Sequence, residues 1–376
     1  MKLRRKTTAF ALTAMITGLH GQTAPKPQMA EEVFKNVQVM KGIPVDEFLG
    51  TMGAFSAALG WSCEDCHKAD DSNWANFAID NAAKIRTRQM IQMMAGINKT
   101  YFQGRQGVTC FSCHRGANHP KVTANLATLY YNKDAMVENP DDVVQPAQGQ
   151  PSAEQILDKF IAAIGGAQRW AGINSYFAKA TNSGYGPESG ARQTEIYAKV
   201  PGQRTVVIHT DNGDATTAVD GRSGWYSAPL RPIPVLTYAA AELGGVKLDA
   251  EMAFPGRIKQ MFTNLKVGFP APIGDKDYQV VQGTTPTGTL ATMYFDPDTG
   301  LLTRMVRYTS SMVGRFPAMS DYSDYHEVNG VKIPYHWTSS WLDGRETYIL
   351  TDVQMNVAID AAKFAKPAPS TPPKSK

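Results

Sequence analysis

Two short cysteine motifs constrain this 376-residue chain more than any other feature of its sequence. The pattern Cys-x-x-Cys-His occurs at residues 63–67 and again at residues 110–114, and the two copies contain all four cysteines. In this pattern two thiols can add to the vinyl groups of a haem, and the following imidazole can bind its iron. The motifs therefore predict two covalently bound haem c groups, held by Cys63, Cys66, Cys110, Cys113, His67 and His114.

Other uses of paired cysteines explain less of the pattern. A CxxC pair can belong to a zinc site, a thioredoxin-like redox centre or a disulfide. Two pairs could close one four-thiolate zinc site, but both trailing histidines would then have no role. A thioredoxin-like centre needs one pair in a βαβ context, and the sequence shows no such context. Haem attachment is the favoured interpretation, and zinc or a disulfide remains the alternative.

The N-terminus has the pattern of a secretory signal peptide. Four basic residues within positions 2–6 precede an apolar run at residues 10–19 that is too short to cross a bilayer. We expect a signal peptide at residues 1–24, with cleavage after Gly21 or Ala24. No cysteine lies near this point, which argues against a lipid anchor, and no later segment has the length and apolar character of a membrane span. These features predict an exported chain in the periplasm, soluble or peripheral to the membrane.

The overall charge gives no sign of a nucleic-acid partner. The formal net charge of +4 includes four basic residues of the expected signal peptide. Removing residues 1–24 leaves 34 basic and 34 acidic side chains, so the mature chain is neutral. A neutral chain lacks the basic surface that binding to nucleic acid requires.

Residues 25–137 have the character of a helical domain that carries both motifs. Residues 31–40 suggest a first short helix, Pro44 begins a second that ends before Gly60, and apolar spacing predicts a third over residues 74–98. Each of the last two is followed by a glycine-containing turn and then by CxxCH. The order helix, turn, motif therefore occurs twice, as a weak internal repeat.

A polar, proline-rich linker is expected at residues 138–151, and the chain changes character after it. Residues 152–366 begin with one helix, capped by Ser152, and continue as short alternating strands separated by tight turns. A disordered tail is expected at residues 367–376. The predicted fold class is α+β with two domains: a mostly helical dihaem domain and an antiparallel, half-barrel-like β domain with a leading helix.

The sixth iron ligands decide what such haems can do. An open sixth position binds oxygen, CO or peroxide, whereas one closed by methionine or histidine carries electrons. Met52 lies on the apolar face of the helix before Cys63, and Met90 and Met93 share one face of the helix before Cys110. Methionine is also a common core filler, so periodicity alone leaves all three assignments open.

The motifs and their surroundings resemble the cytochrome subunit of bacterial photosynthetic reaction centres. The resemblance rests on residues 36–48, on the stretch from Met52 to Gly60, on residues 88–93 and on residues 107–116, and it covers about residues 30–120. In that family a helix typically supplies a methionine ahead of each CxxCH. The resemblance implies that Met52 is the partner of His67 and Met90 the partner of His114, with Met93 as the fallback. The family has four haem segments and lacks the β domain. This chain has two CxxCH motifs, so the resemblance covers only two of the four segments.

The β domain more loosely resembles the half-barrel of outer-membrane lipoprotein carriers. The residues that carry this likeness are 294–302, the hairpin at 325–334 and residues 359–364. Such folds wrap a curved sheet around a helix and can hold an acyl chain. Scaffolding or partner docking is favoured over binding of a lipid or small hydrophobic ligand, because a fold alone does not fix a function.

Local charge suggests an order of redox potentials. Acidic residues such as Asp46 and Glu47 are close in sequence to the first motif, and basic residues such as Lys84 and Arg88 lead to the second. Because cations favour the added electron, the second haem is expected to have the higher potential, with Arg88 or Arg115 near a propionate.

Together these features favour an electron carrier over an enzyme. The expected role is transfer of electrons between redox protein partners, which could include a membrane-bound electron-transfer complex of the reaction-centre type. The alternatives are a dihaem peroxidase-like enzyme, which needs an open iron face, and a haem-based sensor with a ligand-binding β domain.

Overall fold

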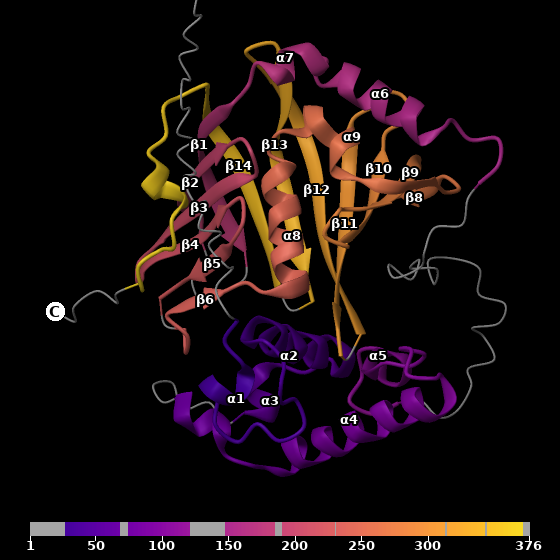
Figure 1. The fold of residues 1–376 in the computed structure, drawn as a ribbon, viewed down its shortest axis with the longest axis vertical. Coiled ribbons are helices and arrows are strands. Elements are labelled where there is room, and N and C mark those ends of the chain that lie inside the picture. Colours follow the sequence, from indigo (N-terminus) through magenta and orange to yellow (C-terminus); the bar gives the residue numbers. More distant parts are fainter. Residues whose placement is uncertain are drawn as a thin grey trace, which may run out of the picture.

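The computed structural model describes residues 27–67, 74–120, 147–184, 190–229, 231–312, 314–342 and 344–370. Within these ranges the chain forms a small helical part and a large β part (Figure 1). The expected signal peptide and residues 138–146 of the expected linker lie outside the described residues. The predicted fold class, α+β with a helical N-terminal region and an antiparallel C-terminal sheet, is confirmed.

The helical part consists of short elements around two longer helices. Its elements are α1 (Ala30–Val33), α2 (Val45–Leu59), α3 (Cys63–Cys66), the 3-10 helix η1 (Trp74–Ala78), α4 (Ala82–Tyr101) and α5 (Cys110–His114). The helix expected to end before Gly60 is confirmed, because Gly60 takes the left-handed conformation that closes α2.

Two predicted helices differ from the structure. The helix expected at 31–40 stops after Val33, and Asn36 then adopts a positive φ of 62° that no helix can contain. The helix expected at 74–98 is interrupted, because Asn81 has an extended backbone and its side chain caps α4 by accepting from the Lys84 amide. Asparagine favours such caps, and this local bond outweighs the apolar periodicity around it.

The β part is one antiparallel sheet of fourteen strands within the described residues. The strands are β1 (Ser175–Gly184), β2 (Arg192–Lys199), β3 (Gln203–Thr210), β4 (Gly213–Asp220), β5 (Gly224–Ser227), β6 (Val235–Thr237), β7 (Thr263–Val267), β8 (Ala271–Ile273), β9 (Lys276–Thr284), β10 (Leu290–Phe295), β11 (Leu302–Ser311), β12 (Gly314–Val328), β13 (Val331–Trp341) and β14 (Gly344–Met355). Their order is β6-β5-β4-β3-β2-β1-β14-β13-β12-β11-β10-β9-β7, with β8 paired to β9. The first and last long strands of the domain, β1 and β14, therefore pair at its centre.

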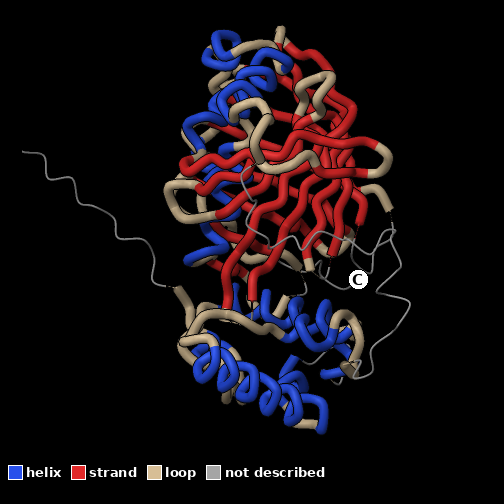
Figure 2. The backbone as a smooth tube through the Cα atoms, turned by 90° about the vertical axis from the view of Figure 1, so that its right-hand side faces the viewer, coloured by secondary structure: helices blue, strands red, loops and turns tan. Residues whose placement is uncertain are grey.

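The sheet curves around its helices, which lie on one side of it (Figure 2). The helices are α6 (Ala153–Ala163), α7 (Ala167–Ala171), α8 (Ala240–Glu251) and α9 (Ile258–Met261), with the 3-10 segment η3 (Pro255–Arg257). A further 3-10 segment, η4 (Ala361–Phe364), follows β14 and lies on the opposite face. Helix α8 packs against β3, β4 and β5 and also against β11, which is far from them in the sheet order. Only a sheet bent around α8 allows both contacts, so the half-barrel shape is confirmed.

Helix α6 anchors the main core and begins where the sequence predicts. Ser152 caps it, because the Ser152 hydroxyl accepts from the Gln155 amide and the Gln155 side chain accepts from the Ser152 amide. Its apolar face is buried against the sheet, and the Phe160 ring lies 5.4 Å from the ring of Phe295. Each such side chain contributes about 1.5–3 kcal/mol through burial.

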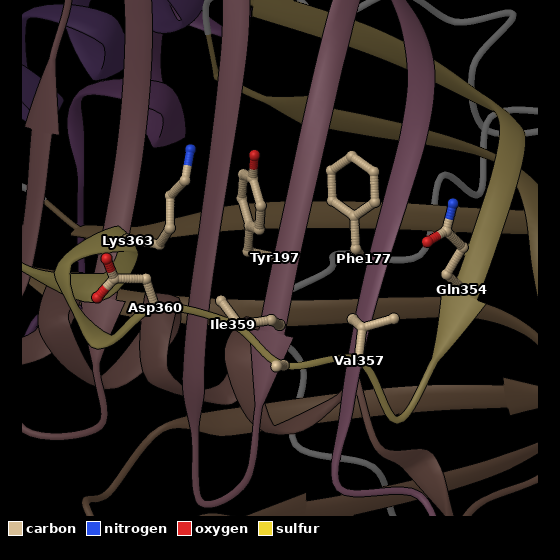
Figure 3. Close-up of a pocket in the computed structure, with 8 residues that line it drawn as sticks. Phe177, Tyr197, Gln354, Val357, Ile359, Asp360 and Lys363 are labelled. Atoms are coloured by element: carbon tan, nitrogen blue, oxygen red, sulfur yellow. The ribbon is translucent and has the colours of Figure 1, made fainter.

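The C-terminal segment after β14 crosses the outer face of the sheet (Figure 3). Thr205 on β3 donates to the Lys363 carbonyl, and the Lys363 ammonium lies 4.5 Å from the centre of the Tyr197 ring. An open pocket of about 300 Å³ lies here, between the segment and the side chains of Phe177 and Tyr197. The segment therefore covers part of the convex surface.

The helical part docks on one end of the sheet through two apolar clusters and several hydrogen bonds. Val45 packs with Ile233 and Leu236, and Met94 packs with Phe316 of the β11–β12 hairpin. At the same interface the Asp46 carboxylate accepts a 2.6 Å hydrogen bond from the Ala239 amide, at the start of α8. The β part thus supplies much of the apolar surface on which the helices rest.

The buried Asp46 carboxyl should make this docking depend on pH. Asp46 is 6% exposed, and burial raises its pKa to about 6. Because the folded state holds this proton more tightly than the unfolded chain, its contribution to stability is present in full below the unfolded pKa and is lost as pH rises through about 6. This rise in the pKa of Asp46 corresponds to about 3 kcal/mol in the free energy of unfolding. Asp46→Asn should remove this dependence.

Urea unfolding of the wild type and of Asp46→Asn at pH 4.5 and pH 7.5 measures this effect. We expect the wild type to lose stability relative to the variant between these two pH values, and Asp211→Asn, at an exposed carboxyl of the β3–β4 turn, serves as the control. An equal difference between wild type and Asp46→Asn at both pH values would contradict the assignment.

Candidate functional site

The first motif forms a single helical turn with its cysteines three residues apart. In α3 the Asp65 carboxylate accepts from the Ser62 amide at 2.7 Å, which closes the turn at its N-terminus. Residues at this spacing lie on one face, so Cys63 and Cys66 present their thiols to the same side. Both thiols are free, and burial raises the pKa of the half-buried Cys66 thiol.

The second motif repeats this geometry in α5. The Ser112 hydroxyl accepts from the Thr109 amide at 3.0 Å, and Thr109 caps the helix in return. Cys110 and Cys113 are again free and one turn apart, and burial raises the pKa of the Cys110 thiol. Each pair therefore has the spacing that addition to two vinyl groups requires.

Both motif histidines have one ring nitrogen held by a backbone carbonyl. His67 Nδ1 lies 3.1 Å from the Phe77 oxygen, and His114 Nδ1 lies 3.0 Å from the Ala117 oxygen. A carbonyl oxygen can only accept, so each Nδ1 carries a hydrogen, and in the neutral ring the lone pair then lies on Nε2. This is the tautomer in which a histidine binds a metal through Nε2, with the other nitrogen oriented by its partner.

The surroundings of His67 favour the neutral ring. The Phe77 ring stacks on it at 4.6 Å between centres. Burial, followed by the nearby Lys84 ammonium, lowers the pKa of His67. A ring kept neutral is the form that donates electrons to a metal.

Helix α4 supports the first motif rather than only leading to the second. The side-chain amide of Asn81 donates to the Cys66 carbonyl at 2.7 Å, and the Lys84 ammonium donates to the carbonyls of Phe77 and Ile79. The η1 turn and the start of α4 therefore hold His67 in place. Lys84, which precedes the second motif in the sequence, therefore lies beside the first motif in the fold.

The expected charge difference between the two motifs is therefore wrong in its details. Lys84 lies at the first motif, and Arg88 is paired with Asp80 at 2.7 Å. Asp46 and Glu47 turn away from the first motif and accept backbone hydrogen bonds from Ala239 and from Met312. Sequence proximity failed here because helices α2 and α4 present these side chains to other neighbours. The predicted order of potentials then rests on the remaining charged residues near the two motifs and stays a prediction.

The second motif is packed tightly against the end of α2. The Gly116 amide donates to the Ala58 carbonyl at 2.9 Å, and Gly60 approaches the Gly116 carbonyl so closely that an added Cβ would overlap with it. Both glycines have positive φ angles, 66° for Gly60 and 80° for Gly116. Position 60 requires glycine for two reasons: the backbone has a positive φ there, and a side chain would overlap with the Gly116 carbonyl.

A buried asparagine fixes the loop between α4 and the second motif. Asn98, 7% exposed, donates to the Val108 carbonyl at 2.8 Å and accepts from the Gly107 and Val108 amides at 2.9 Å each. These three bonds position the residues directly before Thr109 and Cys110. The role of Asn98 could not be predicted from the sequence, because a single asparagine within a helix belongs to no motif or periodic pattern.

The candidate methionines differ in their surroundings. Met52 on α2 and Met90 on α4 are half-buried, whereas Met93 is 49% exposed. Met94, which the sequence analysis did not consider as a site residue, is 6% exposed, and its sulfur lies 4.0 Å from that of Cys110. Its spacing of four residues from Met90 could have indicated a shared face.

The helical part buries little apolar surface of its own, as expected of a domain that packs around a large apolar group. Six of the ten exposed large hydrophobic residues of the described chain belong to it, although it is much the smaller part: Val33, Ile79, Ile85, Met93, Tyr101 and Phe111. Both apolar clusters that it enters also need residues of the β part. A haem bound at each motif would supply the apolar surface that is lacking, so the residues present fit this group.

A shared zinc site receives no support from the geometry. Within the described residues, which include both motifs, no three cysteine, histidine or acidic side chains converge as metal ligands would. The two CxxC pairs lie on separate turns, α3 beside α4 and α5 beside α2. The two motifs therefore lie on separate helical turns with different neighbours.

The sequence of the helical part is similar to known cytochromes. Residues 4–156, which include both motifs, match the family described as "Photosynthetic reaction centre cytochrome C subunit". The photosynthetic reaction center cytochrome c subunit of Thermochromatium tepidum is 37% identical over 103 residues, which cover 26% of this chain and 24% of that protein. The subunit from Rubrivivax gelatinosus is 35% identical over 126 residues, which cover 32% of each chain. The resemblance predicted for residues 30–120 is confirmed, and the chain spans about a quarter to a third of the length of these relatives.

Two of the solved structures that are similar to this chain each match a little more than half of it. A LolA superfamily protein from Nitrosomonas europaea matches with a TM-score of 0.41 and 14% identity, covering 58% of this chain and 99% of that one. A putative outer membrane lipoprotein-sorting protein domain from Vibrio parahaemolyticus gives a TM-score of 0.38 and 10% identity, with coverage of 56% and 95%. Their names agree with the resemblance noted for the C-terminal region.

Proposed function

We propose that this chain is a c-type cytochrome that holds two covalently attached haem c groups and transfers electrons between redox partners. Cys63 and Cys66 would attach the first haem, and Cys110 and Cys113 the second. His67 and His114 would each bind one iron. The observation that supports this most strongly is the matched pair of histidines, whose Nδ1 atoms are both held by backbone carbonyls, which leaves both Nε2 atoms free as ligands.

Methionine ligands would restrict the two sites to electron transfer. We propose Met52 as the second ligand opposite His67 and Met90 as the ligand opposite His114, with Met93 as the fallback. A bound haem supplies an iron that accepts and releases one electron. The thioether would close the sixth position, and the surrounding helices would exclude water, so that oxygen and peroxide have no place to bind.

The partners and the location follow from the same proposal. The named relatives are subunits of photosynthetic reaction centres, so a membrane-bound electron-transfer complex is the partner we propose for this chain, at the periplasmic face. None of the helices in the described parts of the chain combines the length and apolar character needed to cross a membrane. The β part would serve as a scaffold or docking domain, because two apolar clusters join it to the helices.

Carbon monoxide binding to the fully reduced holoprotein separates electron transfer from the alternatives. If both sixth positions are closed, CO should cause no shift of the Soret band. A shift in half of the haem would show one open iron, which would favour a peroxidase-like enzyme or a haem-based sensor and would disprove one methionine ligand. Met52→Ala and Met90→Ala should each open one site, and Met312→Ala, in the β11–β12 turn, serves as the control.

A further inference from the structure

A second cavity lies inside the curve of the sheet, at the end of α8 that is remote from the helical part. Its volume is about 150 Å³, and residues of β1, β2, β3, β12, β13, β14 and the end of α8 line it. The start of α8 at Ala239 contacts Asp46 of the helical part, whereas the cavity is lined by Asp249 and Met252 from the other end. The cavity therefore belongs to the β part alone.

Most of the cavity wall is apolar and well packed. Ile196, Ile333 and Leu350 are each less than 10% exposed, and Trp337 stacks on Tyr348 with ring centres 4.9 Å apart. A cavity of about 150 Å³ with such side chains in its wall is large enough for a benzene-sized molecule. A long acyl chain exceeds this volume.

One cation, Arg204, faces this cavity without a carboxylate partner. It lies on β3 opposite Ala198, a fully buried residue of the inner face, and its guanidinium is close to the hydroxyl of Tyr176. None of the ion pairs formed within the described chain includes Arg204. A half-buried guanidinium in an apolar wall is stabilised chiefly by an anion that bonds to it directly.

The other charge at the cavity is already neutralised. Asp249 accepts from Arg307 at 3.1 and 3.2 Å through Nε, and at 3.0 Å through the terminal nitrogen. Its negative charge is therefore compensated by a partner outside the cavity lining, and Arg204 remains as the charge that a ligand would meet. The pocket on the outer face, beside Phe177 and Tyr197, also has a cation next to it. That cation, the Lys363 ammonium, already contacts the face of the Tyr197 ring.

From this arrangement we infer that the cavity binds a small carboxylate with a benzene-sized apolar body. The carboxylate would bond to the guanidinium of Arg204 and to the hydroxyl of Tyr176. The apolar body would lie against Ile196, Ile333 and Leu350. Size excludes a long-chain lipid, and the unpaired charge favours an acid over a neutral molecule.

Calorimetric titration of the full-length holoprotein with phenylacetate tests this inference, with phenylacetamide and palmitate as comparison ligands. A charge-assisted bond to Arg204 should make the acid bind about tenfold or more tightly than its amide. Arg204→Met should weaken phenylacetate binding by about the same factor and abolish the preference for the acid. Arg222→Met, at an exposed arginine of the β4–β5 turn, should bind like the wild type.

The comparison of acid and amide on the wild type needs no variant, so it decides the question even if Arg204→Met does not fold. No binding of phenylacetate, equal binding of acid and amide, or tighter binding of palmitate would each overturn the inference. An Arg204→Met variant that folds and keeps the preference for the acid would also overturn it. None of these outcomes bears on the two haem motifs.

Discussion

Replacing both thiols of the second motif, Cys110→Ser with Cys113→Ser, is expected to halve the haem content of the purified protein. The four cysteines are free, and each pair forms its own helical turn. Because thioether bonds are the only covalent anchors, the variant should retain the haem at Cys63 and Cys66 and lose the other. The ratio of haem to protein after denaturation, measured by absorbance, should fall from two to one.

The control for this experiment lies within the motif itself. Ser112→Ala removes a hydroxyl that accepts from the Thr109 amide, but it leaves both thiols in place. It should keep both haems at a cost of about 1 kcal/mol in stability. Loss of both haems from the cysteine variant would contradict the account, because it would show that the two motifs hold one shared group.

Gly60→Ala should destabilise the protein by about 3 kcal/mol or more. The substitution adds a side chain at a φ of 66°, which costs about 1 kcal/mol. It also places a Cβ on the Gly116 carbonyl oxygen, so the end of α2 and the second motif must separate. That separation would break the hydrogen bond from the Gly116 amide to the Ala58 carbonyl. Urea unfolding followed by circular dichroism measures the loss.

Gly116→Ala is the matched comparison for this glycine. Gly116 also has a positive φ, but the nearest atom to its added Cβ is the Ala57 oxygen at 4.0 Å. This variant should cost only the conformational strain, about 1 kcal/mol. Equal losses for the two substitutions would show that the close approach of α2 to the second motif does not contribute to stability.

The parts of the fold that sequence predicts well are those set by local rules. Ser152 and Gln155 form a capping box, so α6 begins where expected, and Gly60 ends α2 because few other residues adopt its conformation. The antiparallel strands expected after the helix at Ser152 are also present, since alternation and tight turns are local signals. Where one side-chain bond competes with periodicity, as at Asn81, the prediction fails.

The residues proposed as haem ligands come from the sequence, whereas their surroundings do not. Spacing alone singles out the four cysteines and two histidines, because covalent attachment needs these residues in one turn. Lys84 and Asp46 were assigned to the wrong neighbours, since the packing of α2 and α4 depends on contacts that are distant in sequence. The contact of Met94 with Phe316, more than 200 residues later, has no local signal.

The intact mass of the purified, exported protein tests the central proposal most directly. If both motifs bind haem covalently, the mass should equal that of the mature chain plus two haems, and the haems should remain attached in denaturant. A mass equal to that of the chain alone, or a group that is lost on unfolding, would contradict the assignment of the motifs as haem attachment sites.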